Sequence, residues 1–432
     1  MTALRATARG LAALTAAVAV AAPLAVPASA AIPAKEPITQ AERPDVVAHR
    51  GASAYRPEHT LAAYELAVAQ GADVIEPDLV STKDGVLVDR HENDITGTTD
   101  VSERPEFADR KTTKTVDGVE ITGWFTEDFT LAELKTLRAK ERLPEARPGS
   151  AAYDGMYQVP TFEEDLKLRE ELSAKYGREI GIIPEIKHPS YFDGIGLSRE
   201  EEVIELLEEH GLNHADGRAV VQSFEFSNLA EMNTRLGLQA DTAYLLWYEG
   251  SGYDAVLSGD TAHDYAYFST PAGAAEAAFN GIDIYGPELR QVIALNQDGS
   301  LGAPTGLVEV AHDAGLTVVP YTFRAENQSL PLQFRSSENP VEHGDLAAYI
   351  TEVLDAGVDG FFTDFPDVGV TARDAWLAEK PAEQPSEEPS DGSHAVPGKV
   401  QTGDAAAWLP AGLAAAAAGV LVALRRRLTA AR

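Results

Sequence analysis

The sequence predicts an α/β protein, a closed (β/α)8 or TIM barrel with an insertion after the second strand, a disordered C-terminal spacer and a terminal hydrophobic helix. Two observations predict the barrel. From Pro44 to about Asp367, eight short apolar strands alternate with helical segments, which is the pattern of parallel βα units. In addition, charged residues stand at the ends of several of these strands, where barrels of this kind carry their functional groups.

Length and composition fit one such barrel and exclude several classes of protein. The chain has 432 residues, of which 44% are hydrophobic, enough for the core of a barrel of about 250 residues or more. The formal net charge of -33 argues against binding to nucleic acid or to anionic lipid, because both are negatively charged. The chain has no cysteine, so disulfides and thiol catalysis are excluded.

The barrel domain is expected at residues 45–377, with strands and helices in alternation. The helices are expected at residues 60–70, 162–176 and 198–210, the last of them very acidic. A short hairpin at residues 86–90 follows the second strand. The strands are expected at residues 45–48, 73–79, 181–187, 219–224, 242–247, 281–285, 316–321 and 360–363.

The region between the hairpin and the second helix, residues 93–160, breaks this rhythm. It is rich in Thr, Gly, Asp, Arg and aromatic residues, and one helix is expected in it at Leu131–Glu141. A loop of this length inside a barrel is usually functional or a small subdomain. We interpret the region as a cap that shapes access for a substrate, or alternatively as a stabilising addition.

The N-terminus has the features of a secretory signal peptide at residues 1–30, followed by a short linker at residues 31–44. Arg5 and Arg9 give a basic start, and an apolar run extends from Leu11 to Val26. The sequence Ala28-Ser29-Ala30 then offers a small-x-small cleavage site. A retained membrane helix is the alternative. The sequence thus predicts an exported protein.

The C-terminus predicts anchoring at the cell surface. Residues 378–404 form a spacer rich in Pro, Ser, Glu and Gly, typical of disordered chain. The final segment, residues 405–432, contains an uncharged run near the length that spans a bilayer and then Arg425, Arg426 and Arg427. This order resembles a sortase wall-anchoring signal, although the usual Leu-Pro is missing before Gln401. A single-pass membrane anchor is the alternative, and in both cases the barrel would be extracellular.

Three acidic residues at strand ends predict a metal site. Glu76 and Asp78 are two residues apart on the second strand and therefore project to the same side. Glu185 stands near the end of the third strand, beside Lys187. Buried carboxylates need a compensating cation, and hard oxygen ligands of this kind suit Ca²⁺ or Mg²⁺ better than Zn²⁺. A simple ion pair between Glu185 and Lys187 is the alternative.

Two histidines and two basic residues complete a predicted catalytic group. His49 ends the first strand and His91 follows the hairpin, and imidazoles at these places suit acid and base catalysis near neutral pH. Arg50 and Lys187 would bind an anionic group of a substrate, with a role in orienting a carboxylate as the alternative for Arg50. Gln222 and Phe224 end the fourth strand and are candidates for the wall of a substrate pocket.

Residues 46–91 resemble the glycerophosphodiester phosphodiesterase family, and the resemblance extends more loosely to about Asp367. Glu92 departs from the family, which usually has Asp after the second His. The length of the insertion and the run Pro57-Glu58-His59-Thr60 resemble the exported, calcium-using branch. The matching features are His49-Arg50-Gly51, Pro57-Glu58-x-Thr60, Glu76-x-Asp78, Thr82-Lys83-Asp84-Gly85 and His91.

The resemblance implies a metal-dependent phosphodiesterase with Ca²⁺, or alternatively Mg²⁺, as cofactor. Its substrates would be glycerophosphodiesters, such as glycerophosphocholine and glycerophosphoethanolamine, cleaved to sn-glycerol 3-phosphate and an alcohol. The resemblance also implies that the substrate's 2-hydroxyl attacks first and that water opens the resulting cyclic phosphate, with direct attack by water as the alternative. Glycerol-phosphate wall polymers, lysolipids, and a non-catalytic calcium-dependent binding module are the other hypotheses. No oligomeric state follows from the sequence.

The residues around these motifs are expected to be local or structural. Thr60 or His59 would cap the following helix, and Glu58 would hold a neighbouring loop. Tyr321 and Arg324 end the seventh strand and would hold a glycerol hydroxyl or the polar head of the substrate, with rim packing as the alternative. Asp364 follows the eighth strand, where a role in the site and ordinary rim packing are both open. The remaining histidines show no ligand spacing and are expected at the surface or at helix ends; they are His188, His210, His214, His263, His312 and His343.

Overall fold

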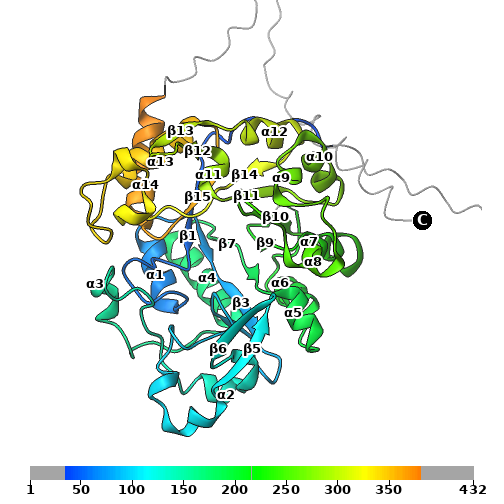
Figure 1. The fold of residues 1–432 in the computed structure, drawn as a ribbon, viewed down its shortest axis with the longest axis vertical. Coiled ribbons are helices and arrows are strands. Elements are labelled where there is room, and N and C mark those ends of the chain that lie inside the picture. Colours follow the sequence, from blue (N-terminus) through cyan, green and yellow to red (C-terminus); the bar gives the residue numbers. More distant parts are fainter. Residues whose placement is uncertain (1–34, 216, 381–432) are drawn as a thin grey trace, which may run out of the picture. The chain divides into compact units, whose positions relative to one another are not determined.

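The strands expected from the sequence lie side by side in a closed ring of parallel strands. The structure is a computed structural model that describes residues 35–215 and 217–380 (Figure 1). Within these residues the ring has the eight predicted strand positions, so the TIM-barrel fold is confirmed. Its strands are β1 (Asp45–His49), β2 (Val74–Glu76), β7 (Gly181–Ile182), β9 (Val220–Ser223), β10 (Asp241–Leu246), β11 (Ile284–Pro287), β14 (Thr317–Val318) and β15 (Gly360–Thr363).

Backbone hydrogen bonds close the ring all the way round. One sheet has the order β15-β1-β2-β7, and a second carries β9, β10, β11 and β14. A parallel bridge from Ile182 to Ala219 joins β7 to β9. On the other side the Asp359 amide donates to the Val318 carbonyl at 2.8 Å and so joins β14 to β15.

The second and third strand positions are each interrupted, which the sequence did not predict. After Pro77 the second strand continues as β3 (Asp78–Ser81), and after Pro184 the third continues as β8 (Glu185–Ile186). Proline has no amide hydrogen to donate to a sheet, so a break at these residues is expected. The two continuations pair with each other, and β3 also pairs with the predicted hairpin strand β4 (Leu87–Asp89).

Helices surround the ring, and their placement confirms the predicted helices. Helix α4 begins and ends as predicted because Thr161 and Glu164 form a capping box at its start and Gly177 ends it with a positive φ. The helices are α1 (Leu61–Ala69), α4 (Phe162–Tyr176), α5 (Pro189–Gly194), α6 (Glu200–Glu209), α7 (Phe226–Glu231), α8 (Tyr253–Ser258), α9 (Tyr265–Phe268), α10 (Pro271–Phe279), α11 (Leu289–Val292), α12 (Leu307–Asp313), α13 (Leu346–Asp355) and α14 (Pro366–Glu379).

The hydrophobic core has two layers. A large cluster fills the space between the ring and its helices, and it includes Val46, Ile75 and Val221. A small cluster fills the inside of the ring, with Val47, Ala243 and Phe362 among its members. A hairpin of β12 (Ile293–Leu295) and β13 (Leu301–Pro304) packs against the large cluster through Ile293 and Leu301.

Residues 93–160 form a subdomain with its own hydrophobic cluster, in which Trp124, Phe129 and Leu134 are buried. It contains the hairpin of β5 (Thr112–Val116) and β6 (Val119–Gly123), which projects from one end of the described chain with α2 in Figure 1. The helix expected at Leu131–Glu141 is wrong in length: α2 covers only Leu131–Leu134, and a second short helix, α3, covers Pro148–Ala151. The chain turns at residues 135–137 after α2, and Ala139 then pairs with Thr99.

Two strand boundaries also differ from the expectation. The sixth strand is shifted to β11, since Gly281 adopts a φ of 90° that belongs to the turn after α10. The seventh strand shortens to β14 before Pro320. Both differences arise at a glycine or a proline, whose backbone properties end or shift a strand even where the apolar pattern continues.

The described residues before the barrel pack along it. Lys35 pairs with Asp283, and the Gln40 amide donates to the carbonyls of Leu354 and Val358. Across residues 35–215 and 217–380, no helix combines the length and the apolar character needed to cross a membrane. The predicted signal peptide, nearly all of the predicted spacer and the whole predicted terminal segment lie outside the described residues.

Candidate active site

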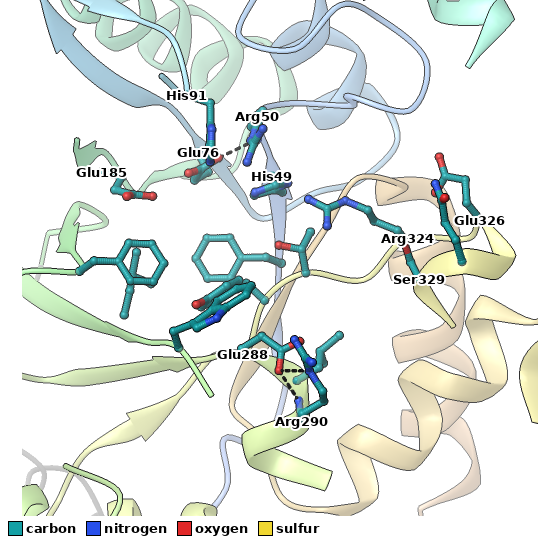
Figure 2. Close-up of a pocket in the computed structure, with 18 of the residues that line it drawn as sticks. His49, Arg50, Glu76, His91, Glu185, Glu288, Arg290, Arg324, Glu326 and Ser329 are labelled. Carbon is teal, nitrogen blue, oxygen red and sulfur yellow. Dashed lines mark hydrogen bonds and ion pairs between the residues drawn. The ribbon is translucent and has the colours of Figure 1, made fainter. Parts of the chain in front are cut away.

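A cavity of about 990 Å³ opens at the carboxyl ends of the strands, and eight of the nine predicted site residues line it. Asp78 is the ninth, and it lies buried beside the cavity. Figure 2 shows side chains from separate strands reaching the same space. The eight that line the cavity are His49, Arg50, Glu76, His91, Glu185, Lys187, Gln222 and Phe224.

The turn after β1 places His49 and Arg50 at the cavity. Arg50 has a φ of 60° and Gly51 a φ of 83°, so the chain reverses sharply at the end of the strand. A side chain at position 51 would meet the Ala63 backbone at 2.7 Å, so only glycine fits there. Thr60 caps α1 by accepting from the Ala63 amide, as predicted.

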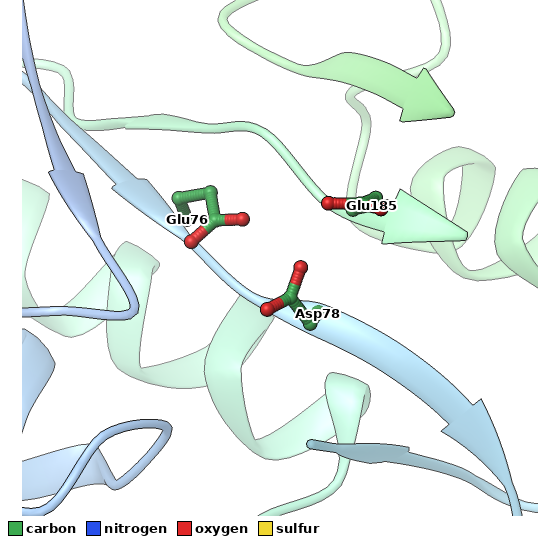
Figure 3. Close-up of side chains that lie close together, drawn as sticks. All are labelled: Glu76, Asp78 and Glu185. Atoms are coloured by element: carbon green, nitrogen blue, oxygen red, sulfur yellow. The ribbon is translucent and has the colours of Figure 1, made fainter. Parts of the chain in front are cut away.

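The three predicted metal ligands come together at the two strand breaks. Asp78 stands opposite Glu185 in the pairing of β3 with β8, and Glu76 stands opposite His49 in the pairing of β1 with β2. Each of the three carboxylates offers an oxygen within 4.8 Å of the others, and all three are buried. Figure 3 shows the three groups pointing toward one another.

The electrostatics of this group fit a bound cation. Burial and the neighbouring Asp78 raise the pKa of Glu76 well above its usual range, and burial raises the pKa of Glu185 to about 8. Asp78 Oδ1 is buried and accepts no hydrogen bond. Uncompensated buried carboxylates are costly, so Glu76, Asp78 and Glu185 are suited to hold a metal ion.

Each imidazole of the site has one nitrogen tied to a carboxylate. His49 Nδ1 lies 2.6 Å from Asp364 Oδ1, and His91 Nδ1 lies 2.8 Å from Glu92 Oε1. This leaves the Nε2 atoms as the groups available for proton exchange. Burial, reinforced by Arg50, lowers the pKa of both His49 and His91 to about 3, so both are neutral bases at pH 7.

The two basic residues are buried and paired. The guanidinium of Arg50 contacts Glu58 at 3.2 Å and Asp78 at 3.5 Å, while its backbone amide donates to Glu76 at 2.7 Å. Lys187 Nζ contacts Glu185 at 2.8 Å. Both alternatives from the sequence are therefore realised: Arg50 orients carboxylates and Lys187 pairs with Glu185, while both side chains still line the cavity.

The predicted pocket residues have different surroundings. Gln222 donates to Glu76 Oε1 at 3.1 Å, so it fixes a predicted ligand besides lining the cavity. Phe224 forms part of the wall and meets the ring of Tyr321 edge to face at 5.8 Å between centroids. The ring of Trp247 stacks on that of Tyr321 at 6.3 Å between centroids.

Several residues of the site were missed or misjudged from the sequence. The sequence leaves both a role in the site and rim packing open for Asp364; the side chain is buried, holds His49 and pairs with Arg147 and Arg324. Its place directly after β15 was the available signal. His188 stands at a helix end, as expected, because it is the N-cap residue of α5. Its side chain is only 14% exposed and bridges Glu92 to a residue of the insertion, which the sequence did not indicate.

His59 was considered for a cap, but it carries a different function. Its Nε2 contacts Asp78 Oδ2 at 2.8 Å and its Nδ1 contacts the Tyr64 hydroxyl at 3.0 Å, with the ring fully buried. Glu58 pairs with Arg142 of the insertion as well as with Arg50. These contacts fix the orientation of predicted site residues, and sequence spacing gave no direct sign of them.

The arrangement suits cleavage of a phosphodiester. Two neutral imidazoles can exchange protons with the entering and leaving oxygens. Buried Arg and Lys side chains can neutralise the phosphate, and three carboxylates can hold a cation that polarises it. A pocket of this size with convergent polar groups is also what a small-molecule substrate requires.

Comparisons with known proteins agree with this chemistry. The glycerophosphodiester phosphodiesterase GDPD6 of Arabidopsis thaliana is 36% identical over 347 residues, which cover 77% of this chain and 86% of that protein. The glycerophosphodiester phosphodiesterase of Haemophilus influenzae is 30% identical over 345 residues, covering 75% and 88%. A crystal structure from Silicibacter pomeroyi, ascribed to a glycerophosphoryl diester phosphodiesterase, has a TM-score of 0.54 at 21% identity, covering 79% of this chain and 96% of that one, and it supports the fold.

The family model matches the part of the chain that forms the barrel. The model of the glycerophosphoryl diester phosphodiesterase family matches residues 49–368, from the first imidazole of the site to the start of the last helix. This match covers most of the chain and contains every predicted site residue. The chain therefore belongs to the glycerophosphoryl diester phosphodiesterase family and is an enzyme of that class, a phosphoric diester hydrolase.

Proposed function

We propose that the chain is an exported, Ca²⁺-dependent enzyme that hydrolyses glycerophosphodiesters, such as glycerophosphocholine and glycerophosphoethanolamine, to sn-glycerol 3-phosphate and an alcohol. One observation carries the proposal. Two carboxylate-tied imidazoles and two buried cations face one cavity, together with Glu76 and Glu185, which converge with the buried Asp78 beside it. Export is supported by the signal-like residues 1–30, and surface anchoring by the uncharged run and arginines of residues 405–432.

Different side chains bind the phosphate and transfer the protons in the proposed reaction. Arg50 and Lys187 hold the phosphate, and one imidazole Nε2 takes the proton of the attacking hydroxyl, which is the substrate's own 2-hydroxyl or that of water. The second imidazole, which the incoming phosphate's charge favours in its protonated form, gives a proton to the leaving oxygen. One P–O bond forms while the P–O bond to the alcohol breaks. If a cyclic phosphate results, the two imidazoles exchange roles while water opens it.

A divalent cation held by Glu76, Asp78 and Glu185 would act as a Lewis acid on a phosphoryl oxygen. All three ligands provide hard oxygen atoms, which favours Ca²⁺ or Mg²⁺. We place Ca²⁺ first because of the resemblance to the calcium-using branch. Mg²⁺, which prefers a stricter octahedral geometry and retains more of its water, is the alternative.

Glycerol-phosphate polymers of a cell wall are a second candidate substrate. The cavity of about 990 Å³ exceeds what a single glycerophosphodiester would fill, and Arg142, Arg324 and Arg335 line it beyond the imidazoles. Basic side chains along the cavity wall favour a substrate with repeated phosphates.

The experiment that tests the proposal is an assay for release of glycerol 3-phosphate from glycerophosphocholine. The protein is treated with a chelator and then supplied with Ca²⁺, with Mg²⁺ or with neither. We expect turnover that requires Ca²⁺ and that falls by about 10²-fold or more in His91→Ala. The exposed His263 serves as the matched control, and His263→Ala should keep full activity. Turnover without any divalent ion, or full activity in His91→Ala, would contradict the proposal.

A further inference from the structure

His91 stands at the end of a chain of hydrogen-bonded side chains that leads into the insertion. Its Nδ1 contacts Glu92 Oε1 at 2.8 Å, and the other oxygen of Glu92 contacts His188 Nε2 at 3.0 Å. His188 Nδ1 then contacts Asp117 Oδ2 at 2.6 Å. We call His91, Glu92, His188 and Asp117 the support chain.

Three separate segments supply these residues. His91 and Glu92 follow β4, His188 stands between β8 and α5, and Asp117 belongs to the insertion. The contact between His188 and Asp117 spans 71 residues of sequence. The local backbone structure of these segments does not by itself require their side chains to form one continuous chain of hydrogen bonds.

The insertion presents Asp117 in a fixed position. Asp117 and Gly118 are the two residues between β5 and β6, and both have positive φ, at 47° and 80°. This is the geometry of a type I′ turn, which an Asp-Gly pair favours and which suits the twist of a two-stranded hairpin. The tip of the hairpin therefore points one carboxylate at His188 by means of ordinary turn chemistry.

His188 has an unfavourable backbone conformation that brings its ring to this place. Its φ is 50°, in the left-handed region where residues other than glycine are uncommon. Such conformations persist where the surroundings enforce them, and they cluster at functional sites. Here the conformation places both ring nitrogens of His188 within hydrogen-bonding distance of carboxylates.

The charges along the support chain alternate. Both nitrogens of His188 face carboxylate oxygens, so both must donate and the ring is an imidazolium. This positive charge lies between the negative Glu92 and the negative Asp117. Glu92 can then hold the Nδ1–H of His91 without contributing an uncompensated negative charge beside the phosphate site.

We propose that Glu92, His188 and Asp117 are positioning residues that hold His91 in the tautomer with a free Nε2. The insertion then contributes to catalysis through Asp117, besides shaping the cavity. This inference rests on the proposed function, in which His91 exchanges a proton with the substrate. Its test must therefore separate a failure of the support chain from a failure of that role.

The test compares Glu92→Gln, Asp117→Asn and His188→Asn with Glu120→Gln in the purified protein. Asn tolerates the left-handed backbone at position 188, so that variant breaks the chain of hydrogen bonds with little strain. Glu120 is exposed on the same hairpin and provides the matched control. Glu92→Asp keeps the charge and tests rescue. Melting temperatures verify that each variant is folded.

We expect Glu92→Gln to lower kcat by about 10²-fold, within the usual range for one acid–base group, with KM changed less than about 2-fold. Asp117→Asn and His188→Asn should lower kcat by about 10-fold, as for partners that orient a functional imidazole. Glu92→Asp should recover most of the loss, and Glu120→Gln should match the wild type. The ¹⁵N shifts of the His91 ring should report the Nδ1–H tautomer in the wild type and a mixture in Asp117→Asn.

Two results would overturn the inference in distinguishable ways. If folded Asp117→Asn and His188→Asn retain the wild-type kcat and His91 ring shifts while His91→Ala is inactive, the proposed role of His91 stands and the support chain is merely structural. If His91→Ala itself is active, the proposed role of His91 fails and the inference fails with it. A change in KM alone in Glu92→Gln would assign Glu92 to substrate binding and would also overturn it.

Discussion

At the residue scale, one buried carboxylate organises the first imidazole of the site. Asp364 is 2% exposed, and its Oδ1 holds His49 while its Oδ2 meets Arg147 at 2.5 Å and Arg324 at 2.9 Å. Although burial alone would raise the pKa of Asp364, Arg324 and Arg147 hold it well below its usual range. The charge therefore persists at neutral pH and keeps a proton on His49 Nδ1. His49 Nε2 is thereby left as the reactive nitrogen.

Replacing Asp364 by Asn should damage both catalysis and stability. The amide cannot fix the His49 tautomer, so we expect kcat to fall by about 10²-fold or more. The replacement also removes the negative charge that pairs with Arg147 and Arg324. Breaking a buried ion pair lowers the free energy of unfolding by about 3–5 kcal/mol. Steady-state kinetics and urea unfolding measure the two effects.

Asp367→Asn is the matched control for this prediction. Asp367 accepts a hydrogen bond from the Tyr55 hydroxyl at 2.7 Å and lies outside the cavity. Its replacement should cost about 1 kcal/mol of stability and leave kcat unchanged. An Asp364→Asn variant that is folded and has wild-type kcat would contradict the role of Asp364.

The residues predicted from the sequence share one property, which explains why they could be found. His49, Glu76 and Glu185 each stand at or beside a strand end, and the barrel brings such ends together at one mouth. His188 and Asp117 were not recognised because their contact depends on how the insertion folds back. A spacing rule contains no information about a contact of that kind.

At the element scale, the broken strands position the acidic group. An unbroken second strand would keep Glu76 and Asp78 within one pairing, yet Glu76 belongs to β2 beside β1 and Asp78 to β3 beside β8. The third strand stays beside the second on both sides of the breaks, as β7 beside β2 and β8 beside β3, while the other neighbour of the second strand changes from β1 to β4. The apolar pattern predicted where the strands lie, but it could not show that Pro77 and Pro184 interrupt them.

The hairpin β5–β6 and the start of α5 are joined by an ion pair whose strength depends on pH. Although burial would lower the pKa of His188, hydrogen bonds to Asp117 and Glu92 raise it to about 9. Lys187 is the neighbouring cation that opposes this rise. Because the pKa is higher in the folded protein than the ordinary 6.5, the pair stabilises the fold fully below about pH 6.5. The stabilisation is lost as the pH rises through about 9.

We therefore expect the difference in free energy of unfolding between the wild type and His188→Gln to depend on pH. The difference in their free energy of unfolding should be at most about 3 kcal/mol below pH 6.5 and should shrink toward pH 10. Urea unfolding at a series of pH values measures it. His263→Gln, which removes an exposed pair with Asp260, should show a much smaller difference. A difference for His188→Gln that is constant from pH 6 to pH 10 would be inconsistent with this assignment.

At the scale of the whole molecule, the fold was predictable because alternation and strand count depend on many residues at once. Single errors, such as the shifted β11 or the short α2, leave the ring intact. The insertion was not predictable in the same way. Its cluster around Trp124 and Phe129 is built from irregular segments, for which periodicity gives no signal.

The whole molecule also keeps three acidic side chains close together in its interior, and this leads to the last prediction. Glu76, Asp78 and Glu185 are each 6% exposed or less, and burial raises the pKa of Glu76 and Glu185, so a bound cation would favour the ionised form of both. A ligand that binds only the folded state stabilises it by about 2.7 kcal/mol at 100 times its dissociation constant. Adding Ca²⁺ to chelator-treated protein at pH 7 should therefore raise the melting temperature, and Glu185→Gln should abolish the rise. Glu201→Gln, on the exposed face of α6, should retain it. An equal rise in Glu185→Gln would place the stabilising cation elsewhere, because the group at the strand breaks would then have lost a ligand without losing the effect.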